Sequence, residues 1–207
     1  MPEIDLDQAN VDTNIRKWGS KLLFVQPMTS APPTTFFGVE DHLPVLPADA
    51  KIFGFITTDG IDQEDSVSSE NTQMDQALEP VRRDLTGIEK TLLTNLGEDN
   101  AYVQALWHGV PVEDWPATSV GPWIYHDGAI SDYPYMRLGV IAVDGVGEMA
   151  RYRYEYAYRA AITAKGARKL ARNASETYSC TWGLFRDAVA KKSYSRLQDG
   201  PFYHQVP

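Results

Sequence analysis

The sequence contains very little cysteine, no long hydrophobic run and few basic residues for its 207-residue length. Its one cysteine, Cys180, excludes an internal disulfide and a cysteine-based zinc cluster, and such sparing use is typical of a chain made in the cytosol. No stretch of about 18 apolar residues occurs, so we expect no membrane-spanning helix. Residues 1–10 are polar and acidic, which does not predict a secretory signal peptide.

Lys and Arg number 19 against 28 Asp and Glu, giving a net charge of −9. This deficit of basic residues disfavours a general nucleic-acid-binding protein, which needs a basic surface. The charge is also uneven, because residues 1–150 carry 24 acidic and 8 basic residues whereas residues 151–207 carry 4 and 11. Opposite charges at the two ends suit head-to-tail association between copies. A functionless scatter of charge would give the same counts.

One glycine-rich segment can be compared with nucleotide-binding loops. Residues 145–150 read GVGEMA, which matches the glycine pattern of dinucleotide sites and follows a predicted strand. Such a site requires a helix directly after the glycines, because the pyrophosphate lies at a helix N-terminus. An alternating tyrosine-rich segment follows here instead. We therefore predict a hairpin turn at this position and no cofactor site.

Residues that could ligate a metal or act as nucleophiles form no familiar constellation. Four clustered acidic residues lack the spacing of a calcium-binding EF-hand, so we predict a solvated acidic loop. They are Asp59, Asp62, Glu64 and Asp65. The histidines are far apart, without an HExxH motif, and no GxSxG motif occurs. They are His42, His108, His126 and His204. We expect no catalytic residue, no cofactor and no metal, and hence no enzyme.

Apolar and β-branched runs predict several short strands separated by proline-rich or glycine-rich loops. The expected strands cover residues 21–25, 52–57, 88–96, 135–143 and 178–184. A helix is predicted at about residues 98–108, where Gly97, Asp99 or Asn100 can cap it and Gly109 can end it. Cys180 falls on the apolar face of the last strand, so we expect it to pack in the core.

The segment at residues 151–162 is ambiguous between helix and strand. Its Ala, Arg and Glu residues favour a helix. Its tyrosines recur at every second position, however, and on a helix they would form no common face. They are Tyr152, Tyr154, Tyr156 and Tyr158, followed in the same phase by Ala160 and Ile162. We predict a long strand whose tyrosines lie in the core or a subunit interface; base stacking is the alternative that the acidic composition disfavours.

These elements predict a mainly β fold of the α+β type. We expect two packed antiparallel sheets forming a β-sandwich or barrel, with one flanking α-helix. Residues 17–186 would form a single domain carrying a long polar loop at residues 59–80. Residues 1–16 and 187–207 would be N-terminal and C-terminal arms.

In the order of its segments, the chain resembles the major tail protein of siphophages, the bacteriophages with long non-contractile tails, particularly those of actinobacterial hosts. The resemblance rests on Trp18–Gly19, the FGFITTDG segment at residues 53–60 and the LEPVRR segment at residues 78–83. Lys165–Gly166 and the strand at residues 178–184 extend it into the second half. It covers roughly residues 15–190, and we expect no immunoglobulin-like decoration domain after it.

The resemblance implies a structural virion protein made in the host cytoplasm and located in the tail. Members of that family form rings, usually hexameric, that stack into the tube through which the genome is delivered. Its expected partners are copies of itself, the tape-measure protein, the tail terminator and the distal tail protein. Phage DNA would pass through the tube without specific binding. The alternative is a tail-terminator or connector ring protein, or the tube subunit of a contractile injection system.

Two sets of residues follow from this expectation. Contacts between subunits or rings are expected at Asp59, Asp62, Glu64, Asp65, Arg82, Arg83, Arg151 and Arg153. An acidic lumen wall would repel phosphates and keep DNA sliding. Residues expected to face that lumen are Glu70, Glu89, Thr91 and Asn95. The arginines of the tyrosine strand conflict with an acidic wall, so we expect them to pair with acids of a neighbouring subunit.

Overall fold

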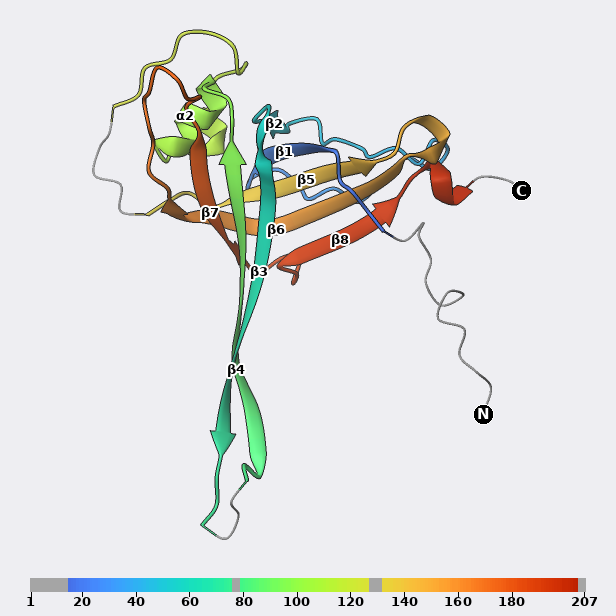
Figure 1. Ribbon diagram of the computed structural model, residues 1–207, viewed down its shortest axis with the longest axis vertical. Coiled ribbons are helices and arrows are strands. Elements are labelled where there is room, and N and C mark those ends of the chain that lie inside the picture. The colour runs from blue at the N-terminus through green and yellow to red at the C-terminus, as the bar shows by residue number, and fades with distance from the viewer. Residues whose placement is uncertain (1–14, 76–78, 127–131, 205–207) are drawn as a thin grey trace.

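The computed structural model describes residues 15–75, 79–126 and 132–204, and in this part the protein is mainly β with a single α-helix (Figure 1). The strands are β1 (Ser20–Pro27), β2 (Lys51–Ile52), β3 (Ile56–Thr72), β4 (Arg82–Leu96), β5 (Met136–Asp144), β6 (Arg151–Lys165), β7 (Tyr178–Phe185) and β8 (Tyr194–Asp199). The helix is α2 (Ala101–Trp107), and 3-10 turns occur at η2 (Val112–Asp114), η3 (Gly147–Met149) and η4 (Pro201–His204). The predicted fold class is confirmed.

All eight strands belong to one antiparallel sheet, ordered β2-β1-β5-β6-β7-β4-β3, with β8 also paired to β6. Strand β6 is where the sheet divides. One of its edges pairs with β5, while the other pairs with β8 over residues 152–157 and with β7 over residues 159–165. The expected two layers are therefore hydrogen-bonded to each other through β6.

A β-bulge in β6 marks this division. Ala157 pairs with Leu138 of β5 and Ala160 pairs with Met136, so two β6 residues lie opposite Arg137 alone. A bulge of this kind reverses which face the following side chains occupy. Upstream of it, the tyrosines pack in one cluster; downstream, Ala160 packs in the other. The tyrosine strand is confirmed, but the prediction that Ala160 and Ile162 continue its face is wrong.

The larger core lies between the β7–β4 part of the sheet, the β1–β5–β6 part and helix α2. Its largest fully buried members include Trp182, Tyr178 and Phe53. The helix forms as predicted, because the Asn100 side chain accepts hydrogen bonds from the backbone N–H groups of Tyr102 and Val103, each at 3.0 Å. It ends where Gly109 adopts a φ of +67°.

A second, aromatic core lies on the opposite face of β1, β5 and β6. Tyr154 and Tyr156 are fully buried there, and Phe36 from the proline-rich loop packs edge-on against Tyr154 with ring centroids 5.0 Å apart. The Tyr156 hydroxyl donates to Gln26 Oε1 at 2.6 Å, which satisfies its polar group. Burial raises the pKa of Tyr156 well above its ordinary value. The central strands are therefore covered on both faces.

Strands β3 and β4 form a hairpin that projects far beyond the body of the protein (Figure 1). The prediction of a polar loop at residues 59–80 requires correction, because residues up to Thr72 belong to β3 and pair with β4. Their sequence has no apolar face to reveal a strand; backbone pairing alone forms it. Asp59–Gly60 does not end a strand but lies in an irregularity within β3, where Gly60 has a φ of +81°.

The predicted C-terminal arm is also corrected. Residues 194–199 form β8 and residues 201–204 form η4, so this segment completes the sheet. The reason is that the first half of β6 would otherwise leave its edge unpaired. Residues 1–14 of the predicted N-terminal arm lie outside the described residues. No helix among the described residues has the length and apolar character to cross a membrane.

Candidate assembly surfaces

The register of the β3–β4 hairpin assigns its side chains to two faces. Directly opposed residues on paired strands point to the same side. Gln63 opposes Leu92, and Leu92 is buried in the larger core, so the face that they share is the inward one. Glu64 opposes Thr91 on the outward face. From here the two faces can be followed along the whole hairpin.

The inward face continues past the body as an uncovered apolar strip, made of Val67, Leu85 and Ile88. Val67 pairs with Ile88, and Leu85 pairs with Ser69 two positions further along β3. The three residues are 56%, 60% and 59% exposed. At the base of the hairpin, the same face is the wall of a packed core. The strip is therefore the core-facing side of a sheet that extends beyond the core it would cover.

Polar contacts hold the base of the hairpin on the body. Gln63 Oε1 accepts hydrogen bonds from the Tyr194 hydroxyl, at 3.1 Å, and from the Arg196 guanidinium. Arg196 also forms an ion pair with Glu155 of β6, its Nε lying 2.9 Å from Glu155 Oε1. Lys90 extends over the Tyr194 ring and reaches Asp65 Oδ2 at 3.4 Å. From these residues toward the tip of the hairpin, β3 and β4 pair with each other.

The outward face of the hairpin is acidic. Its charged members are Asp62, Glu64, Glu70, Asp84, Glu89 and one base, Arg82. Glu64, Ser66, Glu89 and Thr91 line one shallow hollow on it. All four residues that the sequence predicts for a lumen wall lie on this side of β3 and β4: Glu70, Glu89, Thr91 and Asn95. The structure thus places these four residues on one face. That this face borders a lumen stays a prediction.

The predicted contact residues of the hairpin divide between its faces. Asp62, Glu64 and Arg82 lie on the acidic face, whereas Asp65 and Arg83 lie on the inward one. Arg82 Nε binds Asp84 Oδ1 at 2.8 Å, and Arg83 Nε donates to Ser69 Oγ at 2.9 Å. Asp59 is exposed in the irregular part of β3. All six predicted contact residues are exposed, so each can contact another chain.

Arg151 and Arg153, the other predicted contacts, are held within the subunit. Arg151 is 9% exposed; its guanidinium stacks 3.4 Å from the centre of the Phe202 ring, and Nη1 lies 3.9 Å from Asp144 Oδ2. Arg153 lies over the Trp18 ring at 4.4 Å, and its Nε has no hydrogen-bond partner in the described part of the chain. A contact of either residue with a neighbouring subunit stays a prediction.

The sheet leaves strand edges open. Within the described residues, β3 is the last strand of its side of the sheet and pairs only with β4 along its 17 residues. Strand β2 covers β1 only at Phe24 and Val25, so in the part of the chain that the structure describes the first residues of β1 pair with β5 alone. A groove of about 470 Å³ separates residues 18–21 from residues 55–58 at this open edge. Open edges of this kind pair readily with another chain.

The residues considered for chemistry take structural positions. Cys180 is fully buried in the larger core, and burial raises the pKa of its thiol to about 12, so the thiolate nucleophile is not available near neutrality. Gly145 has a φ of +87° in the turn between β5 and β6, and only the three-residue η3 precedes β6 where a cofactor loop would need an α-helix. The predicted turn and the predicted core cysteine are confirmed.

One cluster escaped the sequence reasoning. His42, Asp199 and His204 have ligand atoms within 4.8 Å of one another, whereas the acidic residues 59–65 form no such group in the described chain. These acidic residues belong to β3, and successive side chains of a strand point to opposite faces, so the strand keeps the carboxylates apart. His42 lies 157 residues before Asp199, so no local motif joins them. The only local signal is the pair of Asp199 and His204 flanking the turn at Gly200–Pro201.

Comparison with known proteins finds no relative by sequence and a loose likeness among solved structures. No family model matches the chain, and no curated protein matches it. Among solved structures, one described as the crystal structure of Hcp protein is 10% identical and covers 87% of this chain and 98% of its own, with a TM-score of 0.31. The superposition is too loose for this likeness to carry an argument about function.

Proposed function

We propose that this chain is the tube-forming subunit of a siphophage tail, a structural protein without catalytic activity. The observation that carries the proposal is the β3–β4 hairpin, which projects from the body with its apolar strip uncovered (Figure 1). An isolated two-stranded hairpin is at best marginally stable in water. A partner surface that covers Val67, Leu85 and Ile88 would stabilise it, and the partner most available to a major structural protein is another copy.

Open strand edges support a ring as the form of that assembly. The unpaired edge of β3 and the open start of β1 are different surfaces, so contact between them would be head-to-tail. Heterologous contacts close into rings when the rotation between copies is suitable. The hairpin then extends past its own ring and reaches the next one. Stacking of rings through this hairpin gives a tube.

The acidic face of the hairpin supports the conduit role. With the apolar strip turned toward protein, the opposite face that carries Glu64, Glu70 and Glu89 is left toward the lumen. Carboxylates there repel the phosphates of passing DNA, because the charges have the same sign and salt in the lumen largely screens this repulsion only beyond about 8–10 Å. In this proposal the genome slides through without specific binding.

The remaining expectations of the siphophage resemblance belong to the same proposal. The protein would be made in the host cytoplasm and would reside in the virion tail. Its partners would be further copies of itself, the tape-measure protein, the tail terminator and the distal tail protein. An actinobacterial host fits the segments at residues 53–60 and 78–83 on which the resemblance rests.

Negative-stain electron microscopy of the concentrated, purified chain tests the proposal. We expect tubes of uniform width, or stacked rings that lengthen as the protein concentration rises. Rings that never stack would favour the tail-terminator or connector alternative. A protein that stays monomeric at every concentration, also when mixed with fragments of a sheared tube, would refute self-assembly.

A further inference from the structure

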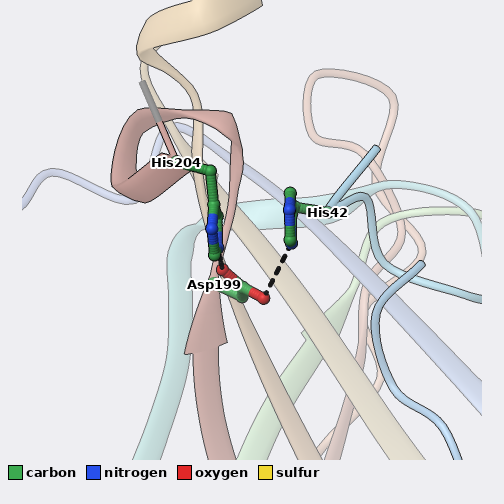
Figure 2. A group of neighbouring side chains, drawn as sticks. All are labelled: His42, Asp199 and His204. Carbon is green, nitrogen blue, oxygen red and sulfur yellow. Dashed lines mark hydrogen bonds and ion pairs between the residues drawn. The ribbon is translucent and has the colours of Figure 1, made fainter. Parts of the chain in front are cut away.

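His42, Asp199 and His204 come from three different segments and converge at one end of the sheet, as Figure 2 shows. His42 belongs to the proline-rich loop, Asp199 ends β8 and His204 ends η4. His42 Nδ1 lies 3.4 Å from Asp199 Oδ2, and His204 Nε2 lies 2.7 Å from Asp199 Oδ1. The carboxylate thus faces one ring nitrogen of each histidine.

The backbone on both sides of the cluster is held in unusual conformations. His42 has a φ of +55°, which a residue with a side chain adopts only at a cost unless its surroundings fix it. Gly200 has a φ of +147°, and a Cβ at this position would lie 2.6 Å from Ala150 O, so only glycine fits the turn. The N–H of Phe202 then donates to the same carbonyl at 3.3 Å. These constraints bring His204 back onto Asp199.

The arrangement of the two rings is the second feature to explain. The imidazoles of His42 and His204 stack with their centroids 3.3 Å apart and only 4° between their planes. Apolar packing does not account for this contact, because both rings retain exposure, with side chains 23% and 43% accessible. Two imidazoles and a carboxylate gathered at an accessible point are instead the donor set of a metal site with open positions.

We propose that His42, Asp199 and His204 bind one divalent transition-metal ion, with zinc the reference case. The ligands would be His42 Nδ1, His204 Nε2 and one Asp199 oxygen. Ligand atoms of a zinc ion lie about 2.0–2.2 Å from the metal, so they must approach one another more closely than the present spread of 4.8 Å. Rotation of the half-buried His42 ring and the exposed His204 ring about their side-chain bonds would bring the ligand atoms together without moving the sheet, and it would separate the stacked rings so that each points its nitrogen at the ion.

The set selects among ions by its chemistry. Two imidazole nitrogens and one carboxylate suit zinc, cobalt and nickel, whereas magnesium and calcium prefer oxygen ligands throughout. Three protein ligands leave at least one coordination position for water or for a donor from another molecule. The ion adds two positive charges to a site whose Asp199 carries one negative charge.

An ion at this position would join the proline-rich loop to the C-terminal turn. The loop places Phe36 and Phe37 over Tyr154 of the aromatic core, and the turn places Phe202 under Arg151. Cross-linking the two segments therefore stabilises the cover of the second core. This role is independent of tube formation, because all three ligands belong to one chain.

Isothermal titration of the full chain, stripped with EDTA and then titrated with Zn²⁺, tests the proposal, and Co²⁺ absorption reports the ligand geometry. We expect one ion per chain and a rise in melting temperature that EDTA reverses. His42→Ala and His204→Ala should each weaken binding by more than the roughly 10–100-fold that loss of an outer partner costs. His126→Ala, at an exposed histidine outside the cluster, is the matched control and should bind like the parent.

Several outcomes would overturn the proposal. One is a parent chain that binds no Zn²⁺ at micromolar concentration; another is a His126→Ala variant that loses binding as much as His204→Ala does. Far-ultraviolet circular dichroism of each variant establishes that it is folded. If His204→Ala does not fold, Asp199→Asn, which keeps the shape of the side chain, replaces it, and unchanged zinc affinity in a folded Asp199→Asn chain would equally refute the site.

Discussion

Val67 and Ile88 lie directly opposite each other on β3 and β4, on the same face of the hairpin, and both are more than half exposed. Replacing both with threonine keeps the β-branched shape that strands favour and removes the apolar surface. We expect tubes to disappear on negative-stain grids. The unfolding free energy should change by no more than about 0.5 kcal/mol, as is usual for exposed positions.

The control for this pair is Ser66→Thr on the opposite face of the same strand. It should assemble like the parent, because the acidic face makes no apolar contact in the proposed tube. Tubes formed equally well by the Val67→Thr/Ile88→Thr chain would mean that the strip is not an assembly surface.

The indole of Trp182 fills the centre of the larger core and donates from Nε1 to Thr94 Oγ1 at 2.9 Å. Trp182→Ala should lower the unfolding free energy by about 3–5 kcal/mol, because it leaves a large cavity. Urea denaturation followed by circular dichroism measures this. Ile124→Ala, at a loop side chain that is 80% exposed, provides the comparison and should be close to neutral.

The Cys180 thiol should not react with a disulfide reagent while the protein is folded. Its residue is fully buried, and burial raises its pKa to about 12. We expect one reactive thiol per chain in denaturant and none in buffer at neutral pH. Fast labelling of the native chain would show that β7 opens readily or that this part of the core is not packed as described.

Much of the fold could be predicted from local patterns, and what could not be predicted depends on distant pairing. Asn100 and Gly109 mark the helix, and the tyrosines of period two mark β6, because capping and alternation are local effects. The bulge opposite Arg137 carries no local signal, since it arises where β6 exchanges β8 for β7 as its neighbour. The same holds for β8 itself, whose pairing with β6 spans about 40 residues of sequence.

The candidate surfaces divide in the same way. Glu89, Thr91 and Asn95 can be assigned to one face once a strand is assumed, because alternation fixes it, whereas Glu70 joins that face only through the pairing of β3 with β4. The apolar strip could not be recognised from sequence, since Val67, Leu85 and Ile88 share a face only through the register of β3 on β4 and its bulge. His42 and His204 meet only because the loop and η4 converge after the sheet has formed.

Protonation of the Asp187 carboxylate should make the protein less stable in acid. Its Oδ1 accepts hydrogen bonds from the backbone N–H groups of Ala190, at 2.7 Å, and Val189, at 2.8 Å, and its Oδ2 lies 3.5 Å from Arg137 Nη1. The hydrogen bond from Ala190 is the largest influence on its pKa, and it outweighs burial, so that the pKa is lowered. A carboxyl whose folded pKa is lowered stabilises the fold above its unfolded pKa, near pH 4, and this contribution is lost as the pH falls further.

Asp187→Asn should therefore be less stable than the parent at neutral pH, by about 1–3 kcal/mol, because Arg137 is left buried without its counter-charge. The difference should shrink as the pH falls below about 4 and through the lowered pKa of Asp187, because the parent then also loses the charge. Urea unfolding across this range measures both effects. Asp84→Asn, from the exposed pair with Arg82, should show neither; a difference that persists undiminished in acid would contradict the assignment to charge.

Charge reversal on the outward face of the hairpin tests the lumen assignment. Glu70 and Glu89 share that face, and Glu89→Lys with Glu70→Lys converts two repelling groups into two that attract phosphate. Tubes of the double variant should form, since the apolar strip is untouched, and should retain short duplex DNA when they are pelleted at low salt. Retention should fall as salt rises, because DNA binding through a few lysines releases condensed counterions.

A control reverses one acidic charge outside the hairpin, at Glu40 in the proline-rich loop, which is exposed. Glu40→Lys tubes should pellet without DNA if the acidic face borders the lumen and the loop does not. Digestion with a nuclease separates the two surfaces further, because DNA inside a tube is shielded and DNA on its outside is cut. DNA that pellets with the Glu70→Lys/Glu89→Lys tubes but is fully digested would place this face on the exterior, and the acidic wall would then have no role in genome passage.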